Sequence, residues 1–439
     1  MRAIYQAIYF LGFLLSSPWW VLRGIANPER LRVTRARLLG PPRILPKLDG
    51  RKRAWVHALS LGEVHSAREL VRELKAKGLD VVVTSTTVSG LAMARASFPG
   101  LPVLPSPLDF RLSLKRFLKS TDPDFLIIVE TDVWPGALAG LKRRNIPASL
   151  VSARLSPRSF ANYRRIRFFW KGVLSMLSHI AAQTEEDREN FIILGAPPDK
   201  VGVAGNLKFD QGSGDPDPSG KERILKEAGW PEGRYILAGS THTGEERLIV
   251  KAYLAALAEH PELKLCVAPR DRQRFARVWR LLQEACPGHA ARRSEPEATP
   301  EGAKVFLLDS LGELERFYAI CDIAIIGKSF PGPHEGGGHN PLEASAKGKP
   351  VLTGPRCHNF KWMYQALLKC GAAEIVEAGK LSERLGRLLD DPAGLKAMGE
   401  EGRDFTMAHR GAAKRTLALV DPEDFGEPEP LETGSGDGI

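Results

Sequence analysis

The chain has 439 residues, of which 43% are hydrophobic and 26% charged, and it carries a net charge of +10. This composition excludes a collagen and an intrinsically disordered protein, and the length allows two or three domains. The five cysteines are odd in number and none are spaced as C-x-x-C, which argues against a disulfide framework and against a zinc site. No RRM, zinc-finger or KH signature is present, so we expect the anionic partner to be a membrane surface and not nucleic acid.

Residues 4–22 form an apolar stretch with aromatic residues toward both ends, which is typical of a membrane segment. Two other interpretations stay open. One is a cleaved signal peptide, although no A-x-A site follows, and the other is a buried amphipathic helix, because Gln6 and Pro18 interrupt the run. Residues 23–53 then hold ten Lys or Arg against two acidic residues. Because positive flanks stay on the cytoplasmic side, we expect residues 1–25 to anchor the chain at the cytoplasmic face of a membrane.

From residue 54 on, short apolar runs alternate with helical patterns, which predicts parallel βα units with both sheet faces covered. Residues 211–220 are rich in Gly, Pro, Ser and Asp and predict a linker. The fold class is therefore α/β, with two doubly wound domains at residues 26–210 and 221–420 and a cleft between them. The acidic residues 421–439 predict a disordered tail. The expected strands lie at residues 54–60, 80–86, 124–130, 147–153, 179–184, 201–206, 235–240, 264–270, 304–309, 321–327 and 349–354.

Ligands of such sheets bind at the carboxyl ends of the strands, so chemistry is expected just after each strand. In the first half, HALSLGE ends with Gly62 as a tight turn and Glu63 at a helix start. Glu63 is either a helix N-terminal acid favoured by the dipole or a general base. Glu130 and Asp132 close another strand, and residues 154–171 form an acid-free basic stretch, either a solvated face or a phosphate contact.

In the second half, backbone amides of residues 238–246 and Arg270, at the end of a strand, are suited to an anion. Residues 336–343 place glycines and His339 before a helix, an arrangement that suggests amides toward phosphate and the Glu343 carboxylate toward ribose hydroxyls. Residues 311–313 mark another strand-to-helix turn.

Two further motifs do not indicate a functional site. Gly327, Lys328 and Ser329 resemble the end of a P-loop, but position 322 is Asp where that motif requires Gly. His334 and His339 are a poor metal pair without further ligands. We therefore expect no metal and no cofactor.

Taken together and in order, HALSLGE, ETDVWPG, SARLSPRS, GNLKFD, STHTGEE, LGEL, GGGHNPLE and KPVLTGP resemble the 3-deoxy-D-manno-octulosonic acid (Kdo) transferases of lipopolysaccharide assembly. The resemblance runs from about residue 20 to residue 420. It implies the two-domain GT-B fold, with an N-terminal acceptor-binding domain and a C-terminal nucleotide-sugar-binding domain. It also implies transfer of Kdo from CMP-Kdo to the lipid A precursor lipid IVA, with inversion, at the cytoplasmic face of the inner membrane.

The resemblance also implies roles for particular residues. Glu63 matches the general base, while Glu130 and Lys208 match residues that stabilise the transition state. Asp132 stands where the family usually has Glu. Two other functions remain open: a GT-B glycosyltransferase with another nucleotide sugar, and a non-catalytic protein that binds a nucleotide sugar or a lipid. The positions that match the binding of CMP are Pro269, Arg270, Leu311, Gly312, Glu313, Asn340, Pro341, Leu342 and Glu343.

Overall fold

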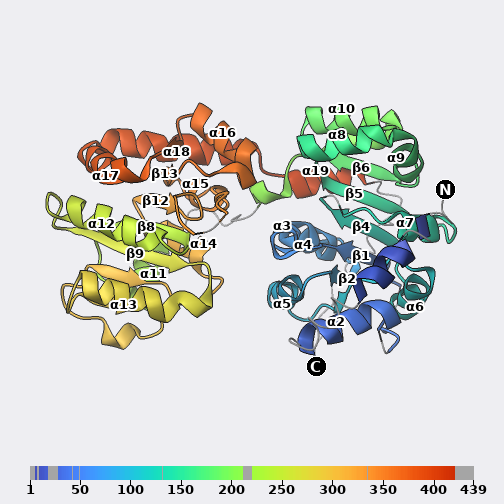
Figure 1. Cartoon of the computed structure of the whole chain (residues 1–439), viewed down its shortest axis with the longest axis horizontal. Helices are drawn as coiled ribbons and strands as arrows, with labels where there is room; N and C mark the ends of the chain where they lie inside the picture. The colour runs from blue at the N-terminus through green and yellow to red at the C-terminus, as the bar shows by residue number, and fades with distance from the viewer. Residues whose placement is uncertain are drawn as a thin grey trace, which may run out of the picture. The chain divides into compact units, whose positions relative to one another are not determined.

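The computed structural model describes residues 5–6, 9–17, 28–41, 43–48, 50–130, 132–210, 220–333 and 335–420. These residues form two compact units (Figure 1). The first unit contains the described residues up to Asp210 together with those from Gly411 on, and the second contains residues Gly220 to Arg410. Most of the expected linker, residues 211–219, and the expected tail, residues 421–439, lie outside the described residues, whereas Gly220 begins a helix.

The first unit is built on a seven-stranded sheet in the order β3-β2-β1-β4-β5-β6-β7, in which every pairing is parallel. Its strands are β1 (Arg53–His57), β2 (Asp80–Ser85), β3 (Val103–Pro105), β4 (Phe125–Val129), β5 (Ala148–Ala153), β6 (His179–Ala182) and β7 (Val201–Val203). Its helices are α2 (Pro28–Leu39), α3 (Leu61–Ser66), α4 (Arg68–Ala76), α5 (Val88–Ser97), α6 (Arg111–Thr121), α7 (Pro135–Lys142), α8 (Pro157–Arg165), α9 (Arg167–Leu174), α10 (Glu185–Leu194) and α19 (Ala412–Leu419).

The second unit is also built on a seven-stranded parallel sheet, in the order β10-β11-β9-β8-β12-β13-β14. Its strands are β8 (Arg234–Thr241), β9 (Leu263–Pro269), β10 (Ala290–Arg292), β11 (Val305–Leu307), β12 (Ile323–Ile326), β13 (Val351–Thr353) and β14 (Ala373–Ile375). Its helices are α11 (Gly220–Ala228), α12 (Glu245–Leu257), α13 (Phe275–Ala285), α14 (Leu314–Phe317), α15 (Leu342–Ser345), α16 (Lys361–Lys369), α17 (Leu381–Asp390) and α18 (Pro392–Ala408).

Helices cover both faces of the first sheet, as the sequence pattern predicts. The apolar strand Phe125–Val129 is buried throughout because one face packs on α3, α4, α5 and α19 and the other packs on α6, α7, α9 and α10. In the second unit, α12, α13, α17 and α18 pack on one face of the sheet through a single apolar cluster. Each unit is therefore an α/β domain built on a parallel sheet, with its own core.

Three strands escape sequence-based prediction: β3, β10 and β14. Each has three residues and lies at an edge of its sheet. These three segments carry no sustained apolar run, because β10 includes Arg292, β14 includes Glu374, and β3 ends on Pro105, a residue that edge strands tolerate. The last residue of the basic stretch 23–53 does not face a membrane surface as expected. The Arg53 side chain is buried and forms an ion pair with Asp80 at 2.7 Å.

The sequence predicts that the second domain ends at residue 420, but in the structure it ends at Arg410. The following helix, α19, belongs to the first unit (Figure 1). Ala412, Ala413 and Leu417 of α19 join the apolar cluster that α4 forms on the first sheet. The Asp210 carboxylate accepts backbone N–H bonds from Gly411, Ala412 and Ala413 at 2.7, 3.2 and 2.6 Å. Because these are the first amides of α19, Asp210 acts as a cap supplied from a distant part of the sequence.

The Asp210→Ala substitution is expected to lower the free energy of unfolding by about 2–3 kcal/mol, because it removes a buried acceptor from three amides. Asp210→Asn keeps one carbonyl acceptor and should cost less. Calorimetric melting of both variants checks the order. Equal melting temperatures for wild type and Asp210→Ala would contradict the capping role.

The N-terminal apolar stretch is helical at residues 5–6 and 9–17 and contacts other residues of the first unit. Tyr5 Oη donates a 2.7 Å hydrogen bond to Asp109 Oδ2, and the rings of Tyr9 and Phe13 lie 5.0 and 5.3 Å from the ring of Phe110. No helix among the described residues combines the length and the apolar character that crossing a bilayer requires.

Candidate functional site

Glu63 lies in the first turn of α3, which follows the carboxyl end of β1. Gly62 belongs to this helix and does not form the tight turn expected from the sequence. The Leu59 N–H donates to Glu63 Oε2 at 2.6 Å, and Ser60 Oγ donates to Oε1 at 3.3 Å. Burial, followed by the negative charges of Glu130 and Asp132, raises the pKa of Glu63 to about 7 despite these bonds. A carboxyl group with this pKa is suited to exchanging a proton near neutral pH.

Glu130 and Lys208 form an ion pair next to Glu63. Lys208 Nζ lies 2.6 Å from Glu130 Oε1, and the two side chains are 16% and 21% exposed. Glu130 follows β4, the sheet neighbour of β1, whereas Lys208 lies in the short helix η2 (Leu207–Asp210) after β7. The sheet therefore gathers residues from three distant parts of the sequence at one edge.

The Lys208 backbone is held by a hydrogen-bonded chain of buried polar groups. Asn206 Oδ1 accepts from the Lys208 N–H, and Asn206 Nδ2 donates to Gln183 Oε1, both at 2.9 Å. Gln183 Nε2 in turn donates to the Ser152 carbonyl at 2.9 Å. Since all members are bonded, the chain fixes the loop that carries Lys208.

His57, at the end of β1, is fully buried and lies beside the Asp132 carboxylate. Its Nε2 is 2.9 Å from Asp132 Oδ2, and its Nδ1 is 2.9 Å from Thr84 Oγ1, which also accepts from the Trp55 indole at 2.8 Å. Burial lowers the pKa of His57, so its ring is neutral at pH 7. The neutral imidazole therefore orients Asp132 without neutralising it.

Four non-glycine residues at strand ends adopt left-handed backbone conformations. Their φ angles are +65° at Glu130, +51° at Ser152, +54° at Ser240 and +61° at Lys328. Such residues are uncommon and cluster at functional sites, because the surrounding structure must hold them in place.

In the second unit, the positions expected to bind CMP follow β9, β11 and β12, and the loop of residues 238–246 continues β8. These four strands are consecutive neighbours in the sheet, in the order β11-β9-β8-β12. Arg270 is exposed, and its backbone N–H donates a hydrogen bond to the Thr241 carbonyl, at the end of β8, at 3.1 Å. Pro269 is buried, whereas Leu311 is 61% exposed and Glu313 lies 3.3 Å from Arg293.

The loop before α15 depends on its glycines. Gly336, Gly337 and Gly338 have φ angles of +75°, +111° and +70°, and a Cβ on Gly337 would lie 2.3 Å from the Asn359 side chain. Asn340 Oδ1 accepts the Leu342 N–H at 3.1 Å. Because α15 has only four residues, its dipole supplies less positive charge than the sequence suggests.

Two histidines join the loops after β8 and β12. His242 Nε2 and His339 Nε2 are 2.9 Å apart, a distance that requires one ring to donate and the other to accept. Tyr364 Oη donates to the His339 carbonyl at 2.7 Å. Among the described residues, no three His, Cys, Asp or Glu side chains gather as a possible metal site.

Comparison with known proteins now supplies the family. A family model described as 3-deoxy-D-manno-octulosonic-acid transferase (kdotransferase) matches residues 28–211. The chain is also 36% identical over 375 residues to the 3-deoxy-D-manno-octulosonic acid transferase of Haemophilus influenzae, across 84% of this chain and 86% of that protein. The chain belongs to the Kdo transferase family. A second transferase of this name, from Bordetella pertussis, is 35% identical and covers 84% of this chain and 86% of its own length.

The fold of this Kdo transferase family member is of the GT-B type, and the chain is a glycosyltransferase. Its structure is similar to that of UDP-GlcNAc 2-epimerase from Neisseria meningitidis bound to UDP-GlcNAc, with a TM-score of 0.56 and 15% identity. The likeness covers 84% of this chain and 99% of the epimerase. At this identity the likeness concerns the fold alone.

The sequence-predicted residues of this Kdo transferase family member fall into two sets. Glu63, Glu130 and Lys208 lie together in the first unit, and the nine positions matched to CMP lie in the second. Sequence reasoning missed His57 and Glu245. His57 directly follows the apolar residues 54–56 of β1, a signal that could have marked it.

Glu245 links the two loops of the second unit. Its carboxylate is fully buried and accepts the N–H groups of His242, Lys328, Ser329 and Phe330 at 2.8, 2.7, 2.9 and 2.9 Å. A buried carboxylate with four donors holds the β8 and β12 loops in one arrangement. We therefore place Glu245 among the positioning residues of this site.

The Glu245→Ala substitution is expected to lower the free energy of unfolding by about 3 kcal/mol or more, because four backbone amides, two of them buried, lose their acceptor. Glu245→Gln, which keeps one acceptor oxygen, should fall between Ala and wild type. Scanning calorimetry of the full chain measures both. A Glu245→Ala protein that melts like wild type would show that these bonds do not fix the loops.

Proposed function

We propose that this glycosyltransferase transfers Kdo from CMP-Kdo to the lipid A precursor lipid IVA, with inversion, in lipopolysaccharide biosynthesis. The observation that carries the proposal is Glu63, whose pKa is raised to about 7 beside the Glu130–Lys208 pair in a chain related to Kdo transferases. The related proteins from Haemophilus influenzae and Bordetella pertussis are both described as 3-deoxy-D-manno-octulosonic acid transferases.

In the proposed reaction, the ionised Glu63 takes the proton of an acceptor hydroxyl while that oxygen attacks the anomeric carbon of Kdo. The bond from this carbon to the CMP phosphate oxygen breaks, and its electron pair leaves with CMP. A single displacement of this kind inverts the anomeric centre. A base with a pKa near 7 is about half ionised at neutral pH and its ionised form still accepts a proton readily, which suits this step.

The departing phosphate needs positive charge, which this chain supplies without a metal in the proposed mechanism. Lys208, fixed by Glu130 and the Asn206 loop, stabilises negative charge in the transition state. Arg270, exposed after β9, binds the phosphate of CMP. The remaining positions proposed for CMP are Pro269, Leu311, Gly312, Glu313, Asn340, Pro341, Leu342 and Glu343.

We propose that the protein works at the cytoplasmic face of the inner membrane. The N-terminal helical residues turn one side to Asp109 and Phe110 and leave Phe10, Leu14 and Leu15 57%, 54% and 74% exposed. Exposed apolar side chains on such a helix suit insertion into the headgroup region. The exposed Arg158, Arg164, Arg165 and Arg167 of α8 and α9, with Phe168 70% exposed, suit an anionic lipid surface.

The rate of transfer at low acceptor concentration should rise with pH through about 7 and level off above pH 8, because only the ionised Glu63 accepts a proton. Initial rates between pH 5.5 and 9 measure this profile. In Glu130→Gln the residual activity should rise at a lower pH than in wild type, because the negative charge of Glu130 that raises the pKa of Glu63 is gone. A rate independent of pH over this range would argue against Glu63 as the base.

Donor choice separates this proposal from a GT-B glycosyltransferase with another nucleotide sugar. The purified protein would be given lipid IVA with either CMP-Kdo or UDP-sugars, and the products would be resolved by chromatography. Transfer from CMP-Kdo alone supports the proposal. Transfer from a UDP-sugar would favour the other enzyme class, and binding of CMP without any transfer would favour a non-catalytic binding protein.

A further inference from the structure

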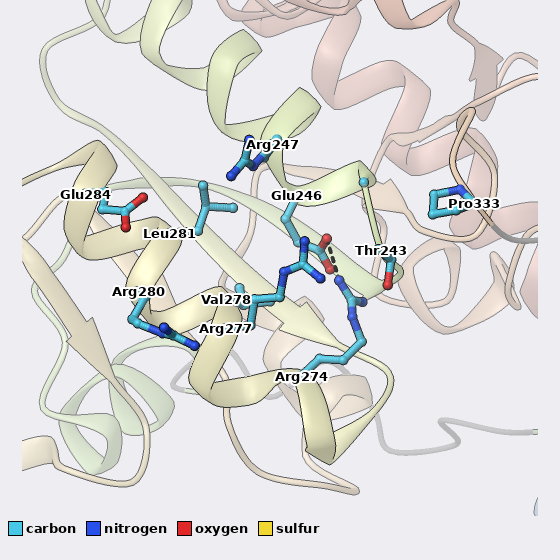
Figure 2. A pocket seen from close by; sticks show the side chains of 11 residues that line it. Thr243, Glu246, Arg247, Arg274, Arg277, Val278, Arg280, Leu281, Glu284 and Pro333 are labelled. Atoms are coloured by element: carbon cyan, nitrogen blue, oxygen red, sulfur yellow. Dashed lines mark hydrogen bonds and ion pairs between the residues drawn. The ribbon is translucent and has the colours of Figure 1, made fainter.

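An arginine-lined pocket lies on the second unit between α12 and the segment formed by η3 (Arg272–Arg274) and α13 (Figure 2). Its volume is about 340 Å³, within the range of small-ligand sites. Arg247 comes from α12, Arg274 from η3, and Arg277 and Arg280 from α13. None of these residues matches the positions proposed for CMP.

Arg274 is fixed by its neighbours. Its Nη2 donates to Glu246 Oε2 at 2.7 Å, drawn as a dashed line in Figure 2, and its Nη1 donates to the Thr241 carbonyl at 3.1 Å. Glu246 is 3% exposed and also accepts from Thr241 Oγ1 at 2.8 Å. The charges of Arg274 and Glu246 therefore cancel, and the rest of the lining sets the charge of the pocket.

The other three arginines are exposed and have no ion pair or hydrogen bond among the described residues. Against Arg247, Arg277 and Arg280, the lining offers only one further carboxylate, that of Glu284. The lining thus keeps an excess of two positive charges and also includes the apolar side chains of Val278 and Leu281 (Figure 2).

A basic face is commonly just solvated, but this one has features that a solvated face does not need. Arg277 and Arg280 are three residues apart on one helix, where like charges repel, and Arg247 lines the same pocket from a second helix. Repulsion of this kind is relieved by a bound anion. A phosphate monoester carries nearly two negative charges and three strong acceptor oxygens, which match the excess charge and the N–H groups of guanidinium.

We propose that this pocket binds a phosphate monoester. The proposal is independent of Kdo transfer, because it rests on the lining residues alone. The monoester belongs either to a soluble phosphate compound or to the headgroup of a membrane lipid, and two experiments distinguish these sources.

The first experiment titrates inorganic phosphate into the full chain by calorimetry in a phosphate-free buffer. Wild type is compared with Arg277→Gln/Arg280→Gln and with the control Lys226→Gln/Lys369→Gln, which removes two exposed charges from α11 and α16. The pocket variant should bind phosphate at least about tenfold more weakly than wild type and control. Phosphate bound at the CMP positions persists in all three proteins, so the difference reports the pocket. Equal binding by all three proteins, or no binding by wild type, overturns the proposal.

The second experiment uses phosphatidylcholine vesicles with and without phosphatidic acid, whose headgroup is a phosphate monoester. Cosedimentation measures the preference of each protein for the acidic vesicles. A preference that is reduced in the pocket variant but kept in the control supports the proposal and assigns the lipid headgroup. An equal preference, combined with weakened phosphate binding in the first experiment, supports the proposal and assigns a soluble monoester.

Discussion

Glu63→Gln is expected to lower Kdo transfer by about 10²–10⁴-fold, because the amide cannot take the proton of the acceptor hydroxyl. The substitution keeps the size of the side chain and an oxygen that accepts the Leu59 N–H. Single-turnover rates with saturating CMP-Kdo and lipid IVA measure the loss.

Stability and binding provide the control for Glu63→Gln. The folded-state pKa of Glu63, about 7, lies above the ordinary value of 4.5, so the stability that its protonated form contributes is complete below about pH 4.5 and lost as the pH rises through 7. At pH 8 Glu63→Gln should therefore melt no lower than wild type. CMP affinity should be unchanged. A lower melting temperature or weaker CMP binding would instead assign Glu63 a structural role.

Lys208→Met is expected to lower the turnover number by about 10²–10³-fold, because it removes a preorganised positive charge while keeping an unbranched side chain of similar length. Lys208→Arg should recover part of the rate, since it restores the charge next to Glu130. Steady-state kinetics with both variants separates the turnover number from KM.

The partner of Lys208 offers a further check. If Lys208 acts only by neutralising Glu130, then adding Glu130→Gln should bring Lys208→Met to the rate of the Glu130→Gln single variant, because the partly buried carboxylate would no longer need a partner. If Lys208 stabilises the transition state, the double variant stays slower than the Glu130→Gln single variant. We expect the second outcome.

The sequence predicts the α/β alternation because parallel strands buried on both faces, such as Phe125–Val129, must be apolar throughout. It misses β3, β10 and β14 because these three-residue strands include Pro105, Arg292 or Glu374 and so leave no sustained apolar run. It also assigns α19 to the wrong unit. The contact that decides this, Asp210 with Gly411, joins residues 201 positions apart, and local periodicity carries no information about it.

The candidate site divides in the same way. Glu63, Glu130 and Arg270 are predicted from their places after strands, and the structure puts Glu130 beside Glu63. The contacts that tune them are not predictable: the His57–Asp132 bond joins residues 75 positions apart, and Glu245 reaches amides more than 80 positions away. In the sequence, Glu245 is typical of an acidic residue in the first turn of a helix, here α12. Only the folded structure shows that its carboxylate also accepts N–H groups of the loop after β12.

The most direct test of the proposed function is mass spectrometry of the lipid products formed by purified protein with freshly generated CMP-Kdo and lipid IVA, beside Glu63→Gln. The proposal predicts one or more added Kdo units with wild type and unmodified lipid IVA with the variant. Unmodified lipid IVA from folded wild-type protein that still binds CMP would contradict transfer to this acceptor, and an equal yield from Glu63→Gln would contradict Glu63 as the base.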